Sequence, residues 1–358
     1  MIYLILQIIF SSAFTLIIKW AQMRGREDVI AIGAVNYIVA ALAILPFVFQ
    51  IDFSATSSDS QLENQTARVE SAEFASAQIE SGSANETDSL VKAETKAKNL
   101  ARSPVMGAMI TGGAMGGIYF IAFFFAIYAI KTVGASSASV VSVLSILMPI
   151  IVASFYWGQH PNTLQIIGIG LALVALSLIG AQKKPKQPAV SAVELAPESS
   201  TEPAPIKNAP TEPVAPAPWV IPTVLIVFFL LCGCSRIFQE AFKFVSQPHL
   251  RPVFLFSAFT IAGIPSLILL INRRRWLTPL ELTFGIFLGL SNILQTHFIL
   301  KAFEYFAGFI VFPVSSAGGV LLTTVLATGL LGERLTKRTC IGIAIAVVAL
   351  FLLHWLPT

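Results

Sequence analysis

Ten apolar stretches, each near the length that crosses a lipid bilayer, constrain the fold of this chain most strongly. A hydrocarbon core about 30 Å thick needs roughly 20 predominantly apolar residues of helix, and a helix satisfies its backbone polar groups internally. The stretches lie near residues 2–22, 29–50, 105–130, 135–157, 163–182, 219–242, 252–272, 280–304, 308–331 and 338–356. We therefore expect an all-α integral membrane protein with ten transmembrane helices.

Two polar insertions interrupt this pattern. Overall, 55% of the residues are hydrophobic and only 12% are charged, whereas soluble domains carry about 25% charged residues. Residues 52–103 are rich in Ser, Ala, Glu and Gln, and residues 183–218 are rich in Pro, Ala and Glu. Segments of this kind bury too little apolar surface to offset the entropy lost on ordering. We expect both insertions to be disordered, and the second to link two halves.

The two halves repeat each other. Residues 158–179 align with residues 332–353 at nine identical positions of 22. In this alignment Gly158 coincides with Gly332, and Gly168 with Gly342. Further pairs are Ala129 with Ala302, Gly134 with Ala307, and Lys19 with Lys243. An internal duplication predicts a first unit at residues 1–182, a linker at 183–218 and a second unit at 219–358.

Five spans in each unit have a geometric consequence. Because five is odd, the second unit enters the membrane upside down relative to the first, which is the inverted-repeat architecture of many secondary transporters. Basic residues such as Arg24, Lys183 and Arg274 then gather on one side of the ten spans. The positive-inside rule makes that side cytoplasmic, so that both termini lie outside if the span count is right.

A turn between the last two apolar stretches carries a family resemblance. The turn Gly332-Glu333-Arg334-Leu335 is followed by Gly342, and the first half has a weaker copy at Gly158-Gln159-His160. This pattern resembles the repeat ending of EamA-type proteins in the drug/metabolite transporter superfamily. The resemblance covers essentially all of the apolar chain. It implies a ten-helix permease, with the bacterial inner (plasma) membrane as the expected location.

The first span departs from the four-helix relatives in that superfamily. Those proteins carry a membrane-embedded Glu, used for proton and cation binding, at the position that Ser11 occupies here. Proton-coupled export of cationic drugs through that residue is therefore not implied. The loss of this Glu indicates either facilitated exchange or a different coupling residue, for which Glu240 is the obvious substitute.

The strongest cluster of polar residues lies on the sixth span. Arg236, Gln239, Glu240 and Lys243 are spaced three, four and seven residues apart, which places them on one helical face. Ionisable groups inside a span are costly and mark functional sites by default. Arg236 could bind a carboxylate or phosphate with Glu240 orienting it. Alternatively, the two side chains form an internal pair that only ties helices together.

Other candidate residues lie on neighbouring spans. Asn292, Gln295 and Thr296 share a face of the eighth span, where their side chains could bind a substrate or an adjacent helix. In the fourth span Ser142 lies before Pro149, and in the ninth span two serines lie after Pro313. The prolines could bend both helices and turn free carbonyl groups towards a cavity. Lys19 completes the expected pathway. We interpret Gly112, Gly113, Gly116 and Gly117 as helix-packing residues.

No enzyme motif and no metal or cofactor motif is found. We expect a secondary transporter for a small polar metabolite, such as an amino acid, that works by alternating access. A carrier for a sugar phosphate, nucleotide sugar or lipid-linked sugar is the alternative of the same fold, and a membrane scaffold or sensor is the alternative of another class. The expected partners are a small-molecule substrate and the lipid bilayer, without nucleic acid, and a homodimer is left open.

Overall fold

The computed structural model describes residues 1–23, 28–51, 104–133, 135–158, 161–180, 219–272, 276–331 and 337–354. All the regular structure in these ranges is helical. The helices are α1 (Ile2–Met23), α2 (Val29–Phe49), α5 (Pro104–Val133), α6 (Ala135–Leu144), α7 (Leu147–Phe155), α8 (Thr163–Gly180), α9 (Val220–Val245), the short 3-10 helix η1 (Pro248–Leu250), α10 (Arg251–Asn272), α11 (Pro279–Ala302), α12 (Gly308–Leu331) and α13 (Lys337–His354). The two predicted insertions, residues 52–103 and 183–218, lie outside the described residues.

Each predicted span corresponds to one helix, except that the fourth is divided into α6 and α7. Pro149 explains the division. It has no N–H to donate to the Ser145 carbonyl, and its ring crowds that carbonyl. The chain tightens there instead: Ile146 N–H donates to Val143 O at 3.0 Å and Met148 N–H to Ser145 O at 3.2 Å. Pro313 lies inside the continuous helix α12.

The lengths and surfaces of the helices are those of a multi-pass integral membrane protein. In the described part of the chain, seven helices are long and apolar enough to cross a membrane, judged by length and composition. Large apolar side chains are exposed along their outer faces, among them Phe49, Ile271 and Leu330. Such a continuous apolar surface is unfavourable in water and favourable against lipid tails.

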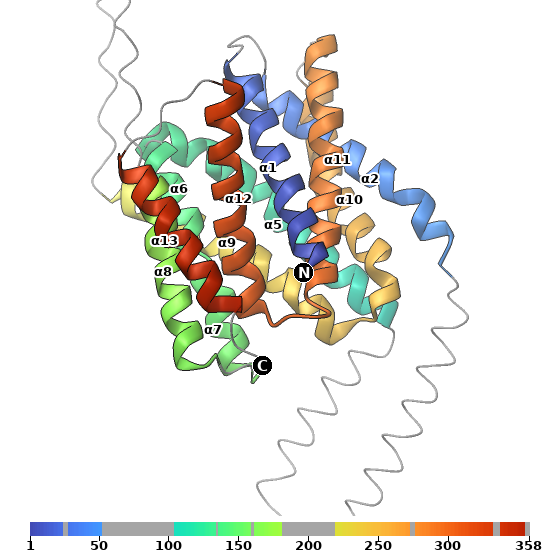
Figure 1. Ribbon diagram of the computed structural model, residues 1–358. Helices are drawn as coiled ribbons and strands as arrows, with labels where there is room; N and C mark the ends of the chain where they lie inside the picture. Colours follow the sequence, from blue (N-terminus) through green and yellow to red (C-terminus); the bar gives the residue numbers. More distant parts are fainter. Residues whose placement is uncertain are drawn as a thin grey trace, which may run out of the picture.

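The helices pack in pairs that join segments far apart in the sequence. As Figure 1 shows, α13 lies against α8 and α1 lies against α11. The further pairs are α5 with α9, α10 with α2, α10 with α5, α11 with α2, and α1 with α12. By their order in the chain, α1, α2 and α5 correspond to α9, α10 and α11. The counterpart of the pair α1–α11 is then α9–α5, and the counterpart of α11–α2 is α5–α10. Both counterparts are among the observed pairs. The pairing is therefore matched between the two sets.

Glycines let two of these pairs approach closely. A Cβ atom on Gly112 would lie 2.3 Å from the Phe254 carbonyl oxygen, and one on Gly116 would lie 2.0 Å from that of Ala258. These contacts join α5 to α10 and confirm the two residues as packing positions. Gly285 and Gly289 also let α11 approach α2: an added Cβ would meet the Val35 side chain at Gly285 and, 2.7 Å away, the Asn36 carbonyl oxygen at Gly289. The separation in sequence between Gly112 and Gly285, and between Gly116 and Gly289, equals that between Ala129 and Ala302.

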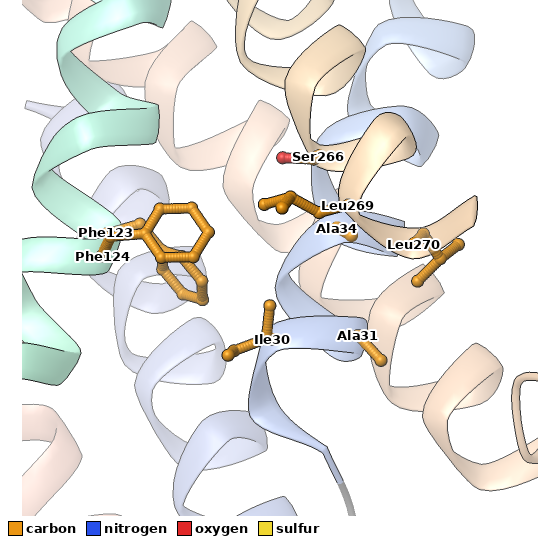
Figure 2. Close-up of a pocket in the computed structure, with 8 residues that line it drawn as sticks. All are labelled: Ile30, Ala31, Ala34, Phe123, Phe124, Ser266, Leu269 and Leu270. Atoms are coloured by element: carbon orange, nitrogen blue, oxygen red, sulfur yellow. The ribbon is translucent and has the colours of Figure 1, made fainter. Parts of the chain in front are cut away.

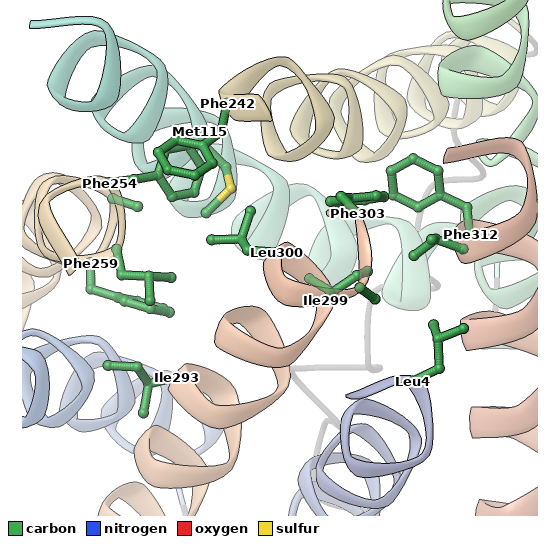
Figure 3. Close-up of a cluster of buried hydrophobic side chains, with 14 of the residues drawn as sticks. Leu4, Met115, Phe242, Phe254, Phe259, Ile293, Ile299, Leu300, Phe303 and Phe312 are labelled. Atoms are coloured by element: carbon green, nitrogen blue, oxygen red, sulfur yellow. The ribbon is translucent and has the colours of Figure 1, made fainter. Parts of the chain in front are cut away.

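A large cluster of buried apolar side chains lies where α5, α9, α10, α11 and α12 meet. Phe254 and Phe259 are fully buried, and Phe303 stacks in a tilted arrangement on Phe312 with ring centroids 5.2 Å apart. Figure 3 shows Met115 beside Phe242 and Phe254, whose ring centroids are 4.9 Å apart, with Leu300 nearby. The cluster is continuous from α10 to Leu4 at the start of α1.

The close contact at Gly116 generates a prediction about stability. Substitution of Gly116 by Ala places a methyl group where the α10 backbone already lies, so the two helices must separate. We expect the free energy of unfolding to fall by about 1–3 kcal/mol, measured by thermal unfolding in detergent. Gly117→Ala is the matched control, because the nearest atom to its added Cβ lies 4.0 Å away. Equal melting temperatures for the two variants would contradict the packing role.

Candidate functional site

A polar cavity of about 820 Å³ lies among helices of both sets. Its walls come from α1, α5, α6, α8, α9, α11 and α12. Gln7, Ser11, Thr15, Ile18, Lys19, Tyr119, Ala122, Ser142, Val143, Leu176, Cys232, Ser235, Arg236, Gln239, Gln295, Thr296, Ile299, Phe312, Ser315, Ser316, Gly319, Val320, Thr323 and Thr324 line it. Hydroxyl and carboxamide groups predominate, so the cavity offers many neutral hydrogen-bonding partners at membrane depth.

Arg236 projects from α9 to the break between α6 and α7. Its Nη1 donates to the Ser142 carbonyl at 3.0 Å and to the Ser145 hydroxyl. The Ser142 carbonyl lacks the partner it would have in an unbroken helix, because Ile146 N–H bonds to Val143 instead. It accepts from the Ser145 hydroxyl at 2.6 Å as well as from Arg236. The break that Pro149 causes thus creates the acceptor that orients the guanidinium.

Gln239 and Tyr119 form a second contact in the cavity wall. Gln239 Nε2 donates to Tyr119 Oη at 2.5 Å, which joins α9 to α5. The Tyr119 carbonyl in turn accepts from the Tyr37 hydroxyl at 3.4 Å, which adds α2. This side of the cavity is therefore held by hydrogen bonds between three helices.

Asn292 ties α11 to α2 instead of lining the cavity. Its Nδ2 donates to Asn36 Oδ1 at 3.2 Å, and both side chains are buried. Its Oδ1 accepts from Gln295 Nε2 at 3.1 Å, and its carbonyl accepts from the Thr296 hydroxyl at 2.8 Å. Asn292 is thus the inner support for Gln295 and Thr296, which do line the cavity.

Glu240 also faces away from the cavity. Its Oε1 accepts from the backbone N–H of Gly308, the first residue of α12, at 3.1 Å. A carboxylate is favourable at a helix N-terminus because the first N–H groups have no partner within the helix. A Cβ on Gly308 would lie only 2.1 Å from the carboxylate, so glycine is the residue that fits.

Of the seven residues predicted for the site, the structure brings five to the cavity: Lys19, Ser142, Arg236, Gln239 and Gln295. Glu240 and Asn292 lie outside its lining, for the reasons given above. In the described chain, the hydrogen bonds of Arg236 go to α6 and to Ser145, and not to Glu240. The expected Arg236–Glu240 unit is thus replaced by two separate contacts made from one helix.

A polar stripe on α1 was missed by the sequence analysis. Gln7, Ser11, Thr15 and Lys19 follow one another at intervals of four residues, and all four line the cavity. On an otherwise apolar span this spacing places them on one face. The signal was therefore present in the sequence, although only Lys19 was included among the site residues.

The structure also has a second, much smaller cavity, whose lining is mostly apolar. Figure 2 shows it between Ile30, Phe123, Phe124 and Leu269, with the side chains of α2, α5 and α10 around it. Its volume is about 10 Å³, which is at the lower limit for one water molecule. The Ser266 hydroxyl beside it already bonds to the Ala262 carbonyl at 2.8 Å. This gap is a packing defect and not a ligand site.

The junction between Glu240 and Gly308 can be tested directly. We expect Gly308→Ala to lower the free energy of unfolding by about 1–3 kcal/mol, because the added methyl group displaces a buried carboxylate. Thermal unfolding in detergent measures this. Gly329→Ala on the same helix is the control, since nothing lies within 4 Å of its added Cβ. A Gly308→Ala protein as stable as that control would exclude a tight junction.

One segment of the chain is similar to a known family. Residues 94–181 match the EamA-like transporter family. An uncharacterized protein of Haemophilus influenzae is 32% identical over 107 residues, which are 29% of this chain and 37% of that protein. The match therefore spans little more than a third of the relative's length.

A solved crystal structure shares the fold. It superposes with a TM-score of 0.59 at 12% identity, over 99% of this chain and 96% of the other. At that identity the likeness concerns the fold alone. The family match at residues 94–181 agrees with the resemblance inferred from the sequence: this segment of the multi-pass membrane protein is similar to the EamA-like transporter family.

Proposed function

We propose that the protein is a secondary transporter that moves a small polar metabolite, such as an amino acid, across the bacterial inner membrane by alternating access. The observation that carries this proposal is the polar cavity of about 820 Å³ between helices of both sets. Ligand sites for small molecules usually have volumes of about 300–1,000 Å³. A space of that size, lined by many hydrogen-bonding side chains inside an apolar helical bundle, supports a substrate site.

Matched positions support two inverted repeats of five helices as the basis of this function. Ser142 and Ser315 are as far apart in the sequence as Gly112 and Gly285. Both serines line the cavity. Ser235 follows Ser11 at the offset by which Lys243 follows Lys19, and these two serines line it as well. Each unit therefore contributes corresponding side chains to one site. Transporters with inverted repeats bind substrates at such an interface and expose them alternately to the two sides.

A carrier for a phosphorylated or nucleotide-linked sugar is the second candidate. Lys19 and Arg236 both line the cavity, and Arg and Lys side chains are the usual partners of phosphate groups. The volume also accommodates a sugar phosphate. This candidate shares the fold and mechanism of the first and differs in substrate only.

The transporter proposal predicts that blocking the cavity abolishes flux. The residue chosen is Thr323, which lines the cavity from α12. We expect Thr323→Phe to reduce uptake to background in proteoliposomes, because the ring occupies the substrate space. The solute is first identified by thermal shift, where a ligand at 100 times its dissociation constant adds about 2.7 kcal/mol to the native state.

Val325→Phe is the matched control, since this neighbouring residue on the same helix is 51% exposed on the outer surface. It should transport normally. Full transport by Thr323→Phe would refute the cavity as the pathway. If no solute moves, while deletion of residues 55–100 and 186–216 abolishes cellular function in a folded protein, the scaffold or sensor alternative is supported instead.

A further inference from the structure

Acidic and basic side chains are separated in this protein. The described ranges contain four acidic residues, Asp28, Glu240, Glu281 and Glu304, and none of them lines the cavity. Two basic residues, Lys19 and Arg236, do line it. The charge of the cavity wall is therefore positive, with no carboxylate of the described chain in that wall to balance it.

Each of the four carboxylates is engaged elsewhere. Glu240 accepts from Gly308 N–H at the start of α12, and Glu281 accepts from the N–H groups of Asp28 at 3.0 Å and Thr278 at 2.9 Å. The side chain of Asp28 accepts from Ile30 N–H at 2.9 Å. Glu304 forms an ion pair with Arg251. Three of the four thus stabilise helix N-termini, and the hydrogen bonds recorded for Arg236 go to Ser142 and Ser145 and not to a carboxylate.

The corresponding position in the first set shows that structure alone does not require an arginine. Ser12 corresponds to Arg236, just as the preceding residue Ser11 corresponds to Ser235. The Ser12 hydroxyl donates to the Gly319 carbonyl of α12 at 3.1 Å, as Arg236 Nη1 donates to the Ser142 carbonyl of α6. One unit thus bonds to a neighbouring helix through a serine, whereas the other does so through a guanidinium, which carries further donors.

The guanidinium retains donors for a ligand. Both hydrogen bonds that the described structure records for Arg236 use Nη1. Nη2 and Nε belong to the same planar fork, whose geometry matches a carboxylate or a phosphate. Because arginine stays protonated at physiological pH and the surroundings have a low dielectric, an anion gains more from this contact than it would in water.

A buried acceptor lies in the same cavity wall. The side chain of Gln7 is 5% exposed, and its Oε1 is buried without a hydrogen-bond partner in the described structure. A buried carbonyl oxygen without a partner is unfavourable, and a donor group on a ligand would supply the missing hydrogen bond. Hydroxyl and amino groups are such donors. The cavity thus has a cationic site for an anion and a neutral acceptor for a donor.

We propose that the cavity selects organic anions of net negative charge that also carry a hydroxyl or amino group, with the carboxylate or phosphate bound to Arg236 and the donor bound to Gln7. This substrate class rests on the proposed transport function and narrows it. Acidic amino acids, hydroxycarboxylates and sugar phosphates fit, whereas basic amino acids and organic cations do not. The carboxylate and phosphate sources share one chemistry at Arg236.

The test measures binding to the full-length protein in nanodiscs with sets of solutes that differ in charge. Glutamate, glutamine and lysine form one set, and glucose 6-phosphate with glucose forms the other. We expect a thermal shift with glutamate, glucose 6-phosphate or both, and none with the neutral or cationic members. The set that responds identifies carboxylate or phosphate as the natural group. Equal shifts across charge within the sets, or shifts only with glutamine, lysine or glucose, would overturn the proposal.

Two variants test the assigned residues. Arg236→Gln should weaken binding of the responding anion by about 10- to 100-fold, and Arg338→Gln, which removes an exposed arginine at the start of α13, should leave it unchanged. Gln7→Met should remove the preference for malate over succinate, which lacks the hydroxyl group. Unchanged anion affinity in Arg236→Gln refutes the site. If that variant does not fold, the selectivity of the wild-type protein decides the charge class.

An error in the proposed substrate class and an error in the proposed transport function would give different results. Anion binding without flux in proteoliposomes would keep the anion site and overturn transport. Flux of a cation that Thr323→Phe abolishes would keep transport and overturn the anion site.

Discussion

The absence of water as a hydrogen-bonding partner in the bilayer core governs this structure. Each N–H and C=O group in the core must find a partner in the protein, which makes the helix the form of every span. Hydroxyl side chains obey the same rule. Thr111, Thr324 and Thr328 donate to the carbonyl four residues earlier, at 2.6, 2.7 and 2.9 Å. A threonine in a span can therefore be satisfied by its own helix, so its presence in the sequence does not by itself indicate a site.

The informative groups are those whose partners lie on another helix. Arg236, Gln239, Glu240 and Asn292 each bond across to a different element, and together they connect α9 to α5, α6 and α12, and α11 to α2. Charged groups at this depth carry a high cost of desolvation. The protein meets that cost with helix termini: amide groups at helix starts receive carboxylates, and the carbonyls of the broken end of α6 receive an arginine.

The positions of the helices could be predicted from the sequence, because the length of an apolar stretch and the thickness of a bilayer leave little freedom. The packing glycines could also be predicted from their Gly-xxx-Gly spacing. Pro149 predicted a bend in the fourth span, where the helix is divided. Partners across helices could not. Glu240 and Gly308 are 68 residues apart, and the spacing of Glu240 from Arg236 suggested a local pair. Local spacing gives the face of a helix but not which neighbour that face meets.

That limitation is clearest on α9. Residues four apart differ by about 40° around a helix, which is enough for one to face a different neighbour from the other. Arg236 reaches α6, in the first set of helices, while Glu240 holds the start of α12, in the second. One turn of one helix therefore contacts both sets by two charged side chains of opposite sign. Since Arg236 holds the break in α6 through Nη1 and would bind an anion through Nη2 and Nε, substrate binding and the contact between the sets involve the same turn of α9.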